Sequence, residues 1–241
     1  MIEAAFISDL HLHPDEPDSL RYFYAWVEWA QTHTRAVYIL GDFFHAWAGD
    51  DTLNAWSGSI ADKLATLSRS GVSVYFMQGN RDFLIGQRFI VRAGMRCLTE
   101  PAFITLGAQR VMLVHGDRYC TNDKVHQRFR RLTRNRWFVA LFLRLPRHLR
   151  MNIVMRVRQR SQGHQSAVAP AVMDVVPSAL MQHARQCYAH VVIHGHTHKP
   201  QITKHTGPVY AFQQIVLSDW EDIPRTLCYN KSKEFYFLDS Y

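Results

Sequence analysis

The chain has 241 residues, 47% of them hydrophobic, which is enough to bury the core of one large domain and excludes a disordered protein. Its four cysteines lie far apart without CxxC spacing, which excludes a disulfide framework or a zinc-thiolate site and fits a reducing cytoplasm. The net charge of +8 arises between Lys124 and Met173, a stretch with twelve basic and no acidic residues, which indicates an anionic partner: nucleic acid, a phospholipid surface or a phosphorylated substrate.

The pattern of apolar runs predicts an α/β fold of alternating strands and helices. Strands are predicted at 3–8, 36–40, 72–77, 111–114 and from 191 onward, with closing β structure near 214–218 and 235–238. Helices are predicted at 19–33, 52–70 and, as one continuous helix, roughly 171–187. The acidic residues Glu3 and Asp9 argue against a signal peptide, and no apolar run approaches the ~20 residues of a transmembrane helix.

Polar residues follow each main strand, and in open α/β sheets ligands bind beyond the carboxyl ends of the strands. The candidate ligands at these positions are Asp9, His11, Asp42, Asn80, His115, His196 and His198. Carboxylates, an amide and imidazoles together suit Mn, Fe, Zn or Co. Seven donors suffice for two ions ~3.5–4 Å apart if one carboxylate bridges them, and Asp42, central in the order, is the candidate bridge.

Taken singly, several of these residues have simpler interpretations. Asp9 could be an N-cap, Asn80 a turn residue and His115 a buried core histidine. Taken together at successive strand ends, they favour one shared site. Other histidines, His126 among them, are interpreted as surface or packing residues, and the pair Asp50 and Asp51 as part of a solvated loop.

Five motifs carry a resemblance to a known family: DLH from Asp9, GDFF from Gly41, GNRD from Gly79, HGD from His115 and GHTH from Gly195. In order and spacing they resemble the calcineurin-like metallophosphoesterase superfamily. The resemblance implies a four-layer α-β-β-α sandwich with two mixed sheets and covers residues 1 to about 220, apart from the Arg-rich insertion. We expect a single domain over residues 1–241. The resemblance also implies one metal held by Asp9, His11, Asp42 and His198 and a second held by Asp42, Asn80, His115 and His196.

Longer stretches such as YILGDFFHAWAGDD, HGDRYCTND and VIHGHTHKP resemble the UDP-2,3-diacylglucosamine diphosphatase family of lipid A biosynthesis. That resemblance implies hydrolysis of UDP-2,3-diacylglucosamine to UMP and 2,3-diacylglucosamine 1-phosphate by a water activated by two Mn²⁺ ions. The expected location is the cytoplasm, peripheral on the inner face of a Gram-negative inner membrane. The implied substrate contacts are Asn80, Arg81, Asp123, Ser161 and His196. The sequence departs from the family at two further contact positions, where Gln165 and Val168 replace the usual Asn and Lys.

Arg81 stands where many phosphoesterases of this superfamily have a histidine. A guanidinium cannot usefully give up a proton, so Arg81 suits neutralisation of a diphosphate rather than protonation of an alkoxide. The alternative for Arg81 is a structural salt bridge with Asp82 or Asp117.

The segment 122–165 predicts an Arg-rich helical insertion. Two apolar helix faces are expected on either side of Pro146: Trp137, Phe138, Leu141, Phe142 and Leu145 before it, and Leu149, Ile153, Val154 and Val157 after it. Arginines flank both faces, which favours a lid that accepts lipid chains and rests on anionic headgroups. The alternative is an ordinary helical hairpin that packs only its own core.

Two rival functions stay open. Another dinuclear phosphoesterase acting on nucleotides or nucleic acid would use the arginines to bind phosphates, but the interleaved apolar faces argue against nucleic acid. A metal-free binding scaffold is the second rival, but all seven ligand positions are filled. We therefore expect a lipid substrate, no nucleic acid and no obligate protein partner.

Overall fold

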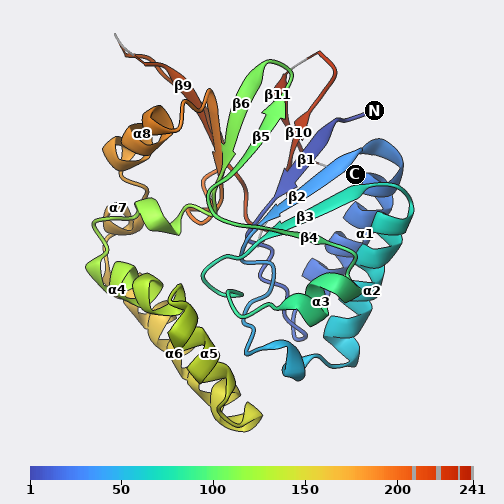
Figure 1. Ribbon diagram of the computed structural model, residues 1–241, viewed down its shortest axis with the longest axis vertical. Coiled ribbons are helices and arrows are strands. Elements are labelled where there is room, and N and C mark those ends of the chain that lie inside the picture. The colour runs from blue at the N-terminus through green and yellow to red at the C-terminus, as the bar shows by residue number, and fades with distance from the viewer. Residues whose placement is uncertain (208–209, 221–223, 233, 240–241) are drawn as a thin grey trace.

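The structure is a computed structural model that describes residues 1–207, 210–220, 224–232 and 234–239, apart from the side chains of residues 164–167 and 170. Two mixed β-sheets form its centre (Figure 1). The first, in the order β11-β10-β1-β2-β3-β4, contains β1 (Ala4–Ile7), β2 (Ala36–Leu40), β3 (Ser73–Met77), β4 (Arg96–Leu98), β10 (Thr226–Tyr229) and β11 (Phe235–Leu238). The second, in the order β5-β6-β7-β9-β8, contains β5 (Ala102–Leu106), β6 (Gln109–Leu113), β7 (Val191–His194), β8 (Gln201–His205) and β9 (Phe212–Val216).

Parallel pairing brings the carboxyl ends of the strands that precede the candidate ligands to one edge of each sheet. In the first sheet β1, β2, β3 and β4 are mutually parallel, with Ile7 paired to Ile39 and Leu40 to Met77. In the second sheet β6, β7 and β9 are parallel. The loops that follow these strands therefore start at neighbouring points, as the sequence predicts.

Apolar side chains on both faces of the sheets divide the molecule into four layers. Between the sheets lie fully buried residues such as Phe6 and Leu40 from the first sheet and Leu113 and Ile193 from the second. Helices α1 (Pro17–His33), α2 (Ala55–Arg69) and α3 (Gln87–Arg92) pack on the outer face of the first sheet, and α8 (Pro177–Gln186) packs on the outer face of the second. The predicted α-β-β-α sandwich is confirmed.

The Arg-rich segment forms three helices, α4 (Lys124–Thr133), α5 (Arg136–Leu143) and α6 (Arg147–Ala167), which project as an arm beyond the strand ends (Figure 1). The expected break between α5 and α6 falls at Pro146, because proline has no backbone N–H and cannot continue a helix. Helix α4 lies within the predicted helical insertion but was not predicted as a separate helix. Asp123 starts it by accepting a hydrogen bond from His126 N at 2.8 Å.

The prediction of one continuous helix over 171–187 is wrong. The chain instead forms the short α7 (Pro170–Met173) and then α8, with an extended residue, Val176, before Pro177. A proline disfavours the helical conformation of the residue that precedes it, so the segment restarts as a new helix with Pro177 in its first turn.

Within the part of the chain that the structure describes, no helix is both long enough and apolar enough to cross a membrane.

Candidate dinuclear metal site

The expected ligand side chains gather beyond the carboxyl ends of five strands. In order, Asp9 and His11 follow β1, Asp42 follows β2, Asn80 follows β3, His115 follows β6, and His196 and His198 follow β7. The short strands end in tight turns, and these turns aim the polar side chains at a common region between the sheets and the helical arm.

The backbone at these positions adopts conformations that most residues avoid. Positive φ angles occur at Asp9 (55°), His11 (50°), Asp42 (53°), His196 (71°) and His198 (55°). A left-handed conformation at a non-glycine residue costs of order 1 kcal/mol or more, and such residues concentrate at functional sites. Hydrogen bonds between the loops hold them in place, for example from His11 N to Asp42 O at 3.0 Å and from His196 N to Asp9 Oδ2 at 2.9 Å.

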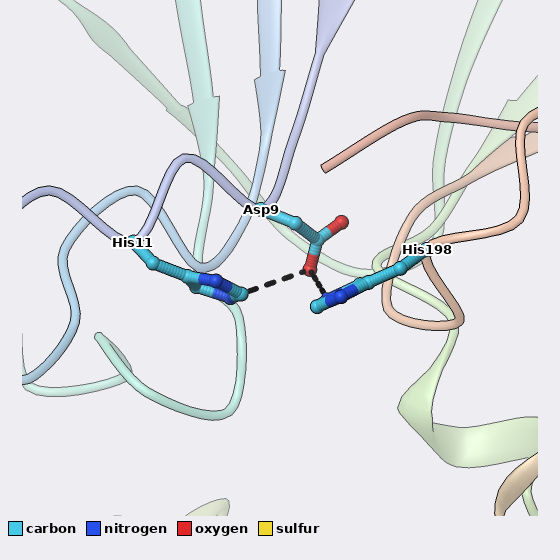
Figure 2. Close-up of side chains that lie close together, drawn as sticks. All are labelled: Asp9, His11 and His198. Atoms are coloured by element: carbon cyan, nitrogen blue, oxygen red, sulfur yellow. Dashed lines mark ion pairs between the residues drawn. The ribbon is translucent and has the colours of Figure 1, made fainter. Parts of the chain in front are cut away.

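Asp9, His11 and His198 form the first cluster (Figure 2). The two imidazoles approach the same carboxylate oxygen, with His11 Nε2 3.9 Å and His198 Nε2 3.4 Å from Asp9 Oδ1. Asp9 Oδ2 accepts hydrogen bonds from Ser8 Oγ and His196 N. Asp9 Oδ1 is buried and accepts no hydrogen bond from the described residues, so it is available to a metal ion.

Asp42, His115 and His196 form the second cluster, and Asn80 joins it through its amide oxygen. His115 Nε2 lies 2.9 Å from Asn80 Oδ1. On the opposite side of the ring, His115 Nδ1 is 2.9 Å from the carbonyl oxygen of Leu40. A carbonyl accepts only, so Nδ1 carries the proton and, in the neutral ring, Nε2 keeps the lone pair that a metal needs.

Asp42 belongs to the second cluster and also faces the first. Its Oδ2 is 3.6 Å from His11 Nε2 in the first cluster, and its Oδ1 is 3.6 Å from His115 Nε2 in the second. Gly79 leaves room for this carboxylate, because a Cβ at Gly79 would overlap Asp42 Oδ1. One oxygen directed to each cluster is the arrangement that a bridging carboxylate requires.

The types and the spacing of the candidate donor atoms indicate whether metal ions can bind in the two clusters. Within each cluster the candidate ligand atoms lie within 4.8 Å of one another. Imidazole nitrogens with carboxylate and amide oxygens match the preferences of divalent transition metals, and the unsatisfied Asp9 Oδ1 is what such an ion would complete. The residues therefore fit two divalent ions.

Electrostatic coupling inside the clusters is strong. Burial lowers the pKa of His115, but the carboxylates of Asp42, Asp9 and Asp117 outweigh burial and raise it to about 9. Burial also opposes ionisation of His198, yet its close contacts with the carboxylates of Asp219 and Asp9 raise its pKa to about 10. Burial alone would raise the pKa of Asp42, but the neighbouring imidazoles and Arg81 hold it well below its usual range. The carboxylates thus remain charged and ready to bind cations.

Two further residues adjoin the clusters and were missed from the sequence. Asp219 Oδ2 lies 3.0 Å from His198 Nδ1. It comes three residues after β9, so the same strand-end pattern could have found it. The ring of His126 lies 5.3 Å from the ring of His196, centroid to centroid, and His126 Nε2 is 3.6 Å from Asp117 Oδ2. His126, interpreted from the sequence as a surface or packing residue, therefore packs beside the second cluster, on a helix that was not predicted separately.

A cavity of about 420 Å³ opens beside the second cluster. Of the expected substrate contacts, Asn80, Arg81 and Ser161 line it. The others do not: the ring of His196 lies beside that of His126, which does line the cavity, Asp123 caps α4, and Val168 is half-buried in the bend after α6. The side chain of Gln165 lies outside the described residues.

Arg81 pairs with neither of the acids considered from the sequence. Its Nε lies 3.2 Å from Asp42 Oδ2, and its backbone N donates to Asp42 Oδ1 at 2.8 Å. Asp82 instead accepts from the backbone N–H groups of Phe43 and Gly79, both at 2.7 Å. Arg81 is therefore directed at Asp42, the candidate bridging carboxylate, and at the cavity rather than held in a remote structural pair.

Fold and site together define a metal-dependent phosphoesterase, and comparison with known proteins agrees. The model of the calcineurin-like phosphoesterase family matches residues 3–200, so the chain belongs to that family. Its relatives include the UDP-2,3-diacylglucosamine hydrolase of Aeromonas hydrophila, 43% identical over 89% of both chains. The enzymes of the same name from Chromohalobacter salexigens and Shewanella piezotolerans are 40% and 39% identical over 89% and 92% of this chain, and 87% and 92% of theirs. A solved archaeal phosphodiesterase shares the fold, with a TM-score of 0.51 at 12% identity over 98% of both chains.

Proposed function

We propose that this protein hydrolyses the diphosphate of UDP-2,3-diacylglucosamine to UMP and 2,3-diacylglucosamine 1-phosphate, with two Mn²⁺ ions held by the seven strand-end ligands. The relatives named above carry this substrate in their names and match nearly the whole chain. The proposal thereby assigns the chain a step of lipid A biosynthesis.

The main support for the proposal is that the cavity is lined partly by polar and partly by apolar side chains. Polar side chains, among them Asn80, Arg81, Arg158 and Ser161, line it together with a wall of apolar ones. The apolar lining is formed by Trp47, Phe83, Val125, Phe129, Leu132, Phe138, Phe142, Ile153, Val154 and Val157. A substrate that joins phosphates to acyl chains matches both parts, whereas a nucleotide or nucleic acid would leave the apolar wall uncovered.

Arg81 and Arg158 supply the positive charge for the phosphates. Arg158 is 7% exposed, and its Nε has no hydrogen-bond partner among the described residues. Burial and the neighbouring charge of Arg81 lower the pKa of Arg158 to about 10. Because the two positively charged guanidinium groups repel each other, a bound anion close to both would reduce this repulsion. Their N–H donors also fit phosphate oxygens.

The remaining roles follow from the positions of the side chains. Bound divalent ions supply Lewis acidity that activates water and stabilises charge on the transferred phosphoryl group. Asp42 and the histidines hold and orient those ions, with Leu40 O fixing the tautomer of His115. Arg81 neutralises the diphosphate, and a sugar phosphate leaves without needing a proton from the enzyme.

The apolar residues of helix α5 suggest how the protein binds a lipid substrate at a membrane. Phe138 and Phe142 line the cavity, while Trp137 and Leu141 are 72% and 66% exposed. The Arg136 guanidinium lies 5.0 Å from the centre of the Trp137 ring. Exposed apolar residues among arginines suit an anionic membrane surface, so we infer that residues 122–165 form a lid that docks on the cytoplasmic face of the inner membrane.

A substrate panel tests the proposal. Purified protein with Mn²⁺ is assayed on UDP-2,3-diacylglucosamine, the same UDP-sugar without acyl chains, a small chromogenic phosphodiester and a dinucleoside polyphosphate. We expect the acylated UDP-sugar to give by far the highest kcat/KM and UMP as a product. A higher kcat/KM on the dinucleoside polyphosphate would assign the protein to nucleotide hydrolysis instead.

A further inference from the structure

We infer that Arg150 is a positioning residue that locks helix α6 to the loop carrying Trp47, and thereby fixes the apolar wall of the cavity for its substrate. This inference rests on the proposed function, because it assigns the locked wall to acyl-chain binding.

Arg150 is an unusual residue for the start of an exposed helix. Its side chain is only 2% exposed, whereas the arginines on either side of it along the chain, Arg147 and Arg156, are exposed. Nε donates to Leu145 O at 3.0 Å, Nη1 donates to Ala48 O, and Nη2 donates to Asp51 Oδ2. A buried guanidinium is retained only where such partners compensate its lost hydration.

The loop residues are shaped to receive this side chain. Gly49 has φ 115°, a conformation that favours glycine, and a Cβ there would overlap Arg150 Nη1. The Arg150 guanidinium holds the pKa of the Asp51 carboxyl below its usual range. Asp50 and Asp51 both lie in a 3₁₀ turn, and the expectation of a solvated loop is wrong for Asp50, which is half-buried and accepts hydrogen bonds from Trp47, Gly86 and Phe89; the Asp51 carboxylate is exposed but pairs with Arg150.

The same loop is tied to the active site. Trp47 N donates to Arg81 O at 3.3 Å, and Trp47 Nε1 donates to Asp50 Oδ1 at 3.1 Å. Asp50 in turn accepts from the backbone N–H groups of Gly86 and Phe89, at 2.8 and 3.0 Å, where α3 begins. Trp47 thus has a fixed position, and Arg150 fastens the helical arm to it.

On α6, Arg150 occupies the face that lines the cavity. Val154, Val157, Arg158 and Ser161 follow it at spacings of four, seven, eight and eleven residues, which places them on one side of the helix. If the Arg150 contacts break, α6 is free to rotate or lift, and these four side chains lose their common orientation toward the cavity. The metal ligands, which lie on the strand-end loops, do not depend on that orientation.

The test compares Arg150→Met with Arg156→Met, an exposed arginine of the same helix that loses the same charge. In nonionic detergent, we expect Arg150→Met to raise KM for the acylated UDP-sugar about tenfold, since three hydrogen bonds to a charged group are lost. Turnover of the small phosphodiester and the metal content should stay unchanged. Asp51→Asn should shift KM in the same direction by less, because Ala48 O remains as a partner, and Arg156→Met should behave as the parent protein.

Hydrogen exchange supplies a readout that does not need the substrate. Backbone amides of residues 147–162 should exchange faster in Arg150→Met, while those of β1, β2 and β7 keep their protection. Unchanged exchange over 147–162 in Arg150→Met overturns the inference, as does a loss of activity on the small diester equal to the loss on the lipid. If the parent protein fails to hydrolyse the acylated UDP-sugar, the proposed function falls, and exchange alone still decides whether Arg150 locks α6.

Discussion

His198 Nδ1 and Asp219 Oδ2 lie 3.0 Å apart, on the side of the imidazole that faces away from Asp9. This contact fixes the ring so that Nε2 is directed at the first cluster, and a carboxylate on the far nitrogen makes the ring a better donor to a metal. Because Asp219 contacts His198, a candidate ligand of the first cluster, its removal should affect the metal ion of that cluster more than the other.

We predict that Asp219→Asn weakens metal binding at the first cluster by roughly 10–100-fold and leaves the second cluster nearly unchanged. The check is a Mn²⁺ titration of metal-free protein that resolves two binding steps. Asp239→Asn is the control, because Asp239 is 61% exposed and pairs only with Arg225 among the described residues. Equal weakening of both steps would mean that Asp219 supports the fold of the loops rather than one site.

Asp42→Ala should abolish binding of both metal ions and nearly all turnover. The reason is its position, with one carboxylate oxygen 3.6 Å from a histidine of each cluster. His198→Ala should lose only the ion of the first cluster, so about one metal ion per chain should remain when the protein is analysed by elemental mass spectrometry. Retention of both ions in Asp42→Ala would exclude a bridging role for that residue.

Metal binding should release protons at neutral pH. In the metal-free protein the pKa values of His115 and His198, about 9 and about 10, keep both rings protonated at pH 7. A metal ligand must be neutral, so binding should expel about two protons and tighten as pH rises toward 9. Calorimetry in buffers of different ionisation enthalpy measures this number.

The stability of the metal-free protein should follow the opposite trend. A raised pKa in the folded state stabilises the fold below the unfolded value of about 6.5 and loses that contribution as pH rises through the folded value. The free energy of unfolding without metal should therefore fall between about pH 7 and 10, whereas with saturating Mn²⁺ it should not. Chemical denaturation at pH 7 and 9, with and without metal, separates the two cases.

Local sequence signals account for the parts of the fold and site that could be predicted. A buried strand of four or five residues that ends in a polar turn is recognisable within one short window, so the sequence alone predicts that Asp9, Asp42 and His115 share one site. The pairing of Arg150 with Asp51 is not predictable in this way, because the partners are 99 residues apart and the contact exists only after the helical arm has folded.

Two other features have local signals that the predictions overlooked. Helix α4 carries Val125, Phe129 and Leu132 at spacings of four and three residues, and all three line the cavity. The many basic residues of this helix obscured its apolar stripe in the sequence, so the position of His126 was missed as well. Pro177 marks the start of α8, yet the apolar periodicity on both sides of it favoured one continuous helix.

We expect the adjacent residues Trp137 and Phe138 to have different roles, Trp137 in membrane contact and Phe138 in substrate binding. Phe138 lines the cavity and stacks near Phe142, with ring centroids 5.8 Å apart, whereas the Trp137 side chain is mostly exposed. Phe138→Ser should lower kcat/KM for the acylated UDP-sugar in detergent by roughly 5–30-fold, corresponding to about 1–2 kcal/mol of lost apolar contact at a half-buried side chain. Its activity on the small phosphodiester should not change.

Trp137→Ser should leave detergent activity near that of the parent protein but weaken sedimentation with vesicles that contain anionic phospholipid. An indole at a membrane surface contributes apolar area that a serine lacks, and the flanking arginines provide attraction that salt should screen. Vesicles of neutral phospholipid serve as the control, and binding to them should be weak for both proteins. If Trp137→Ser instead lowers activity on the acylated substrate in detergent as much as Phe138→Ser does, both faces of α5 serve substrate binding, and the division between docking and chain recognition is wrong.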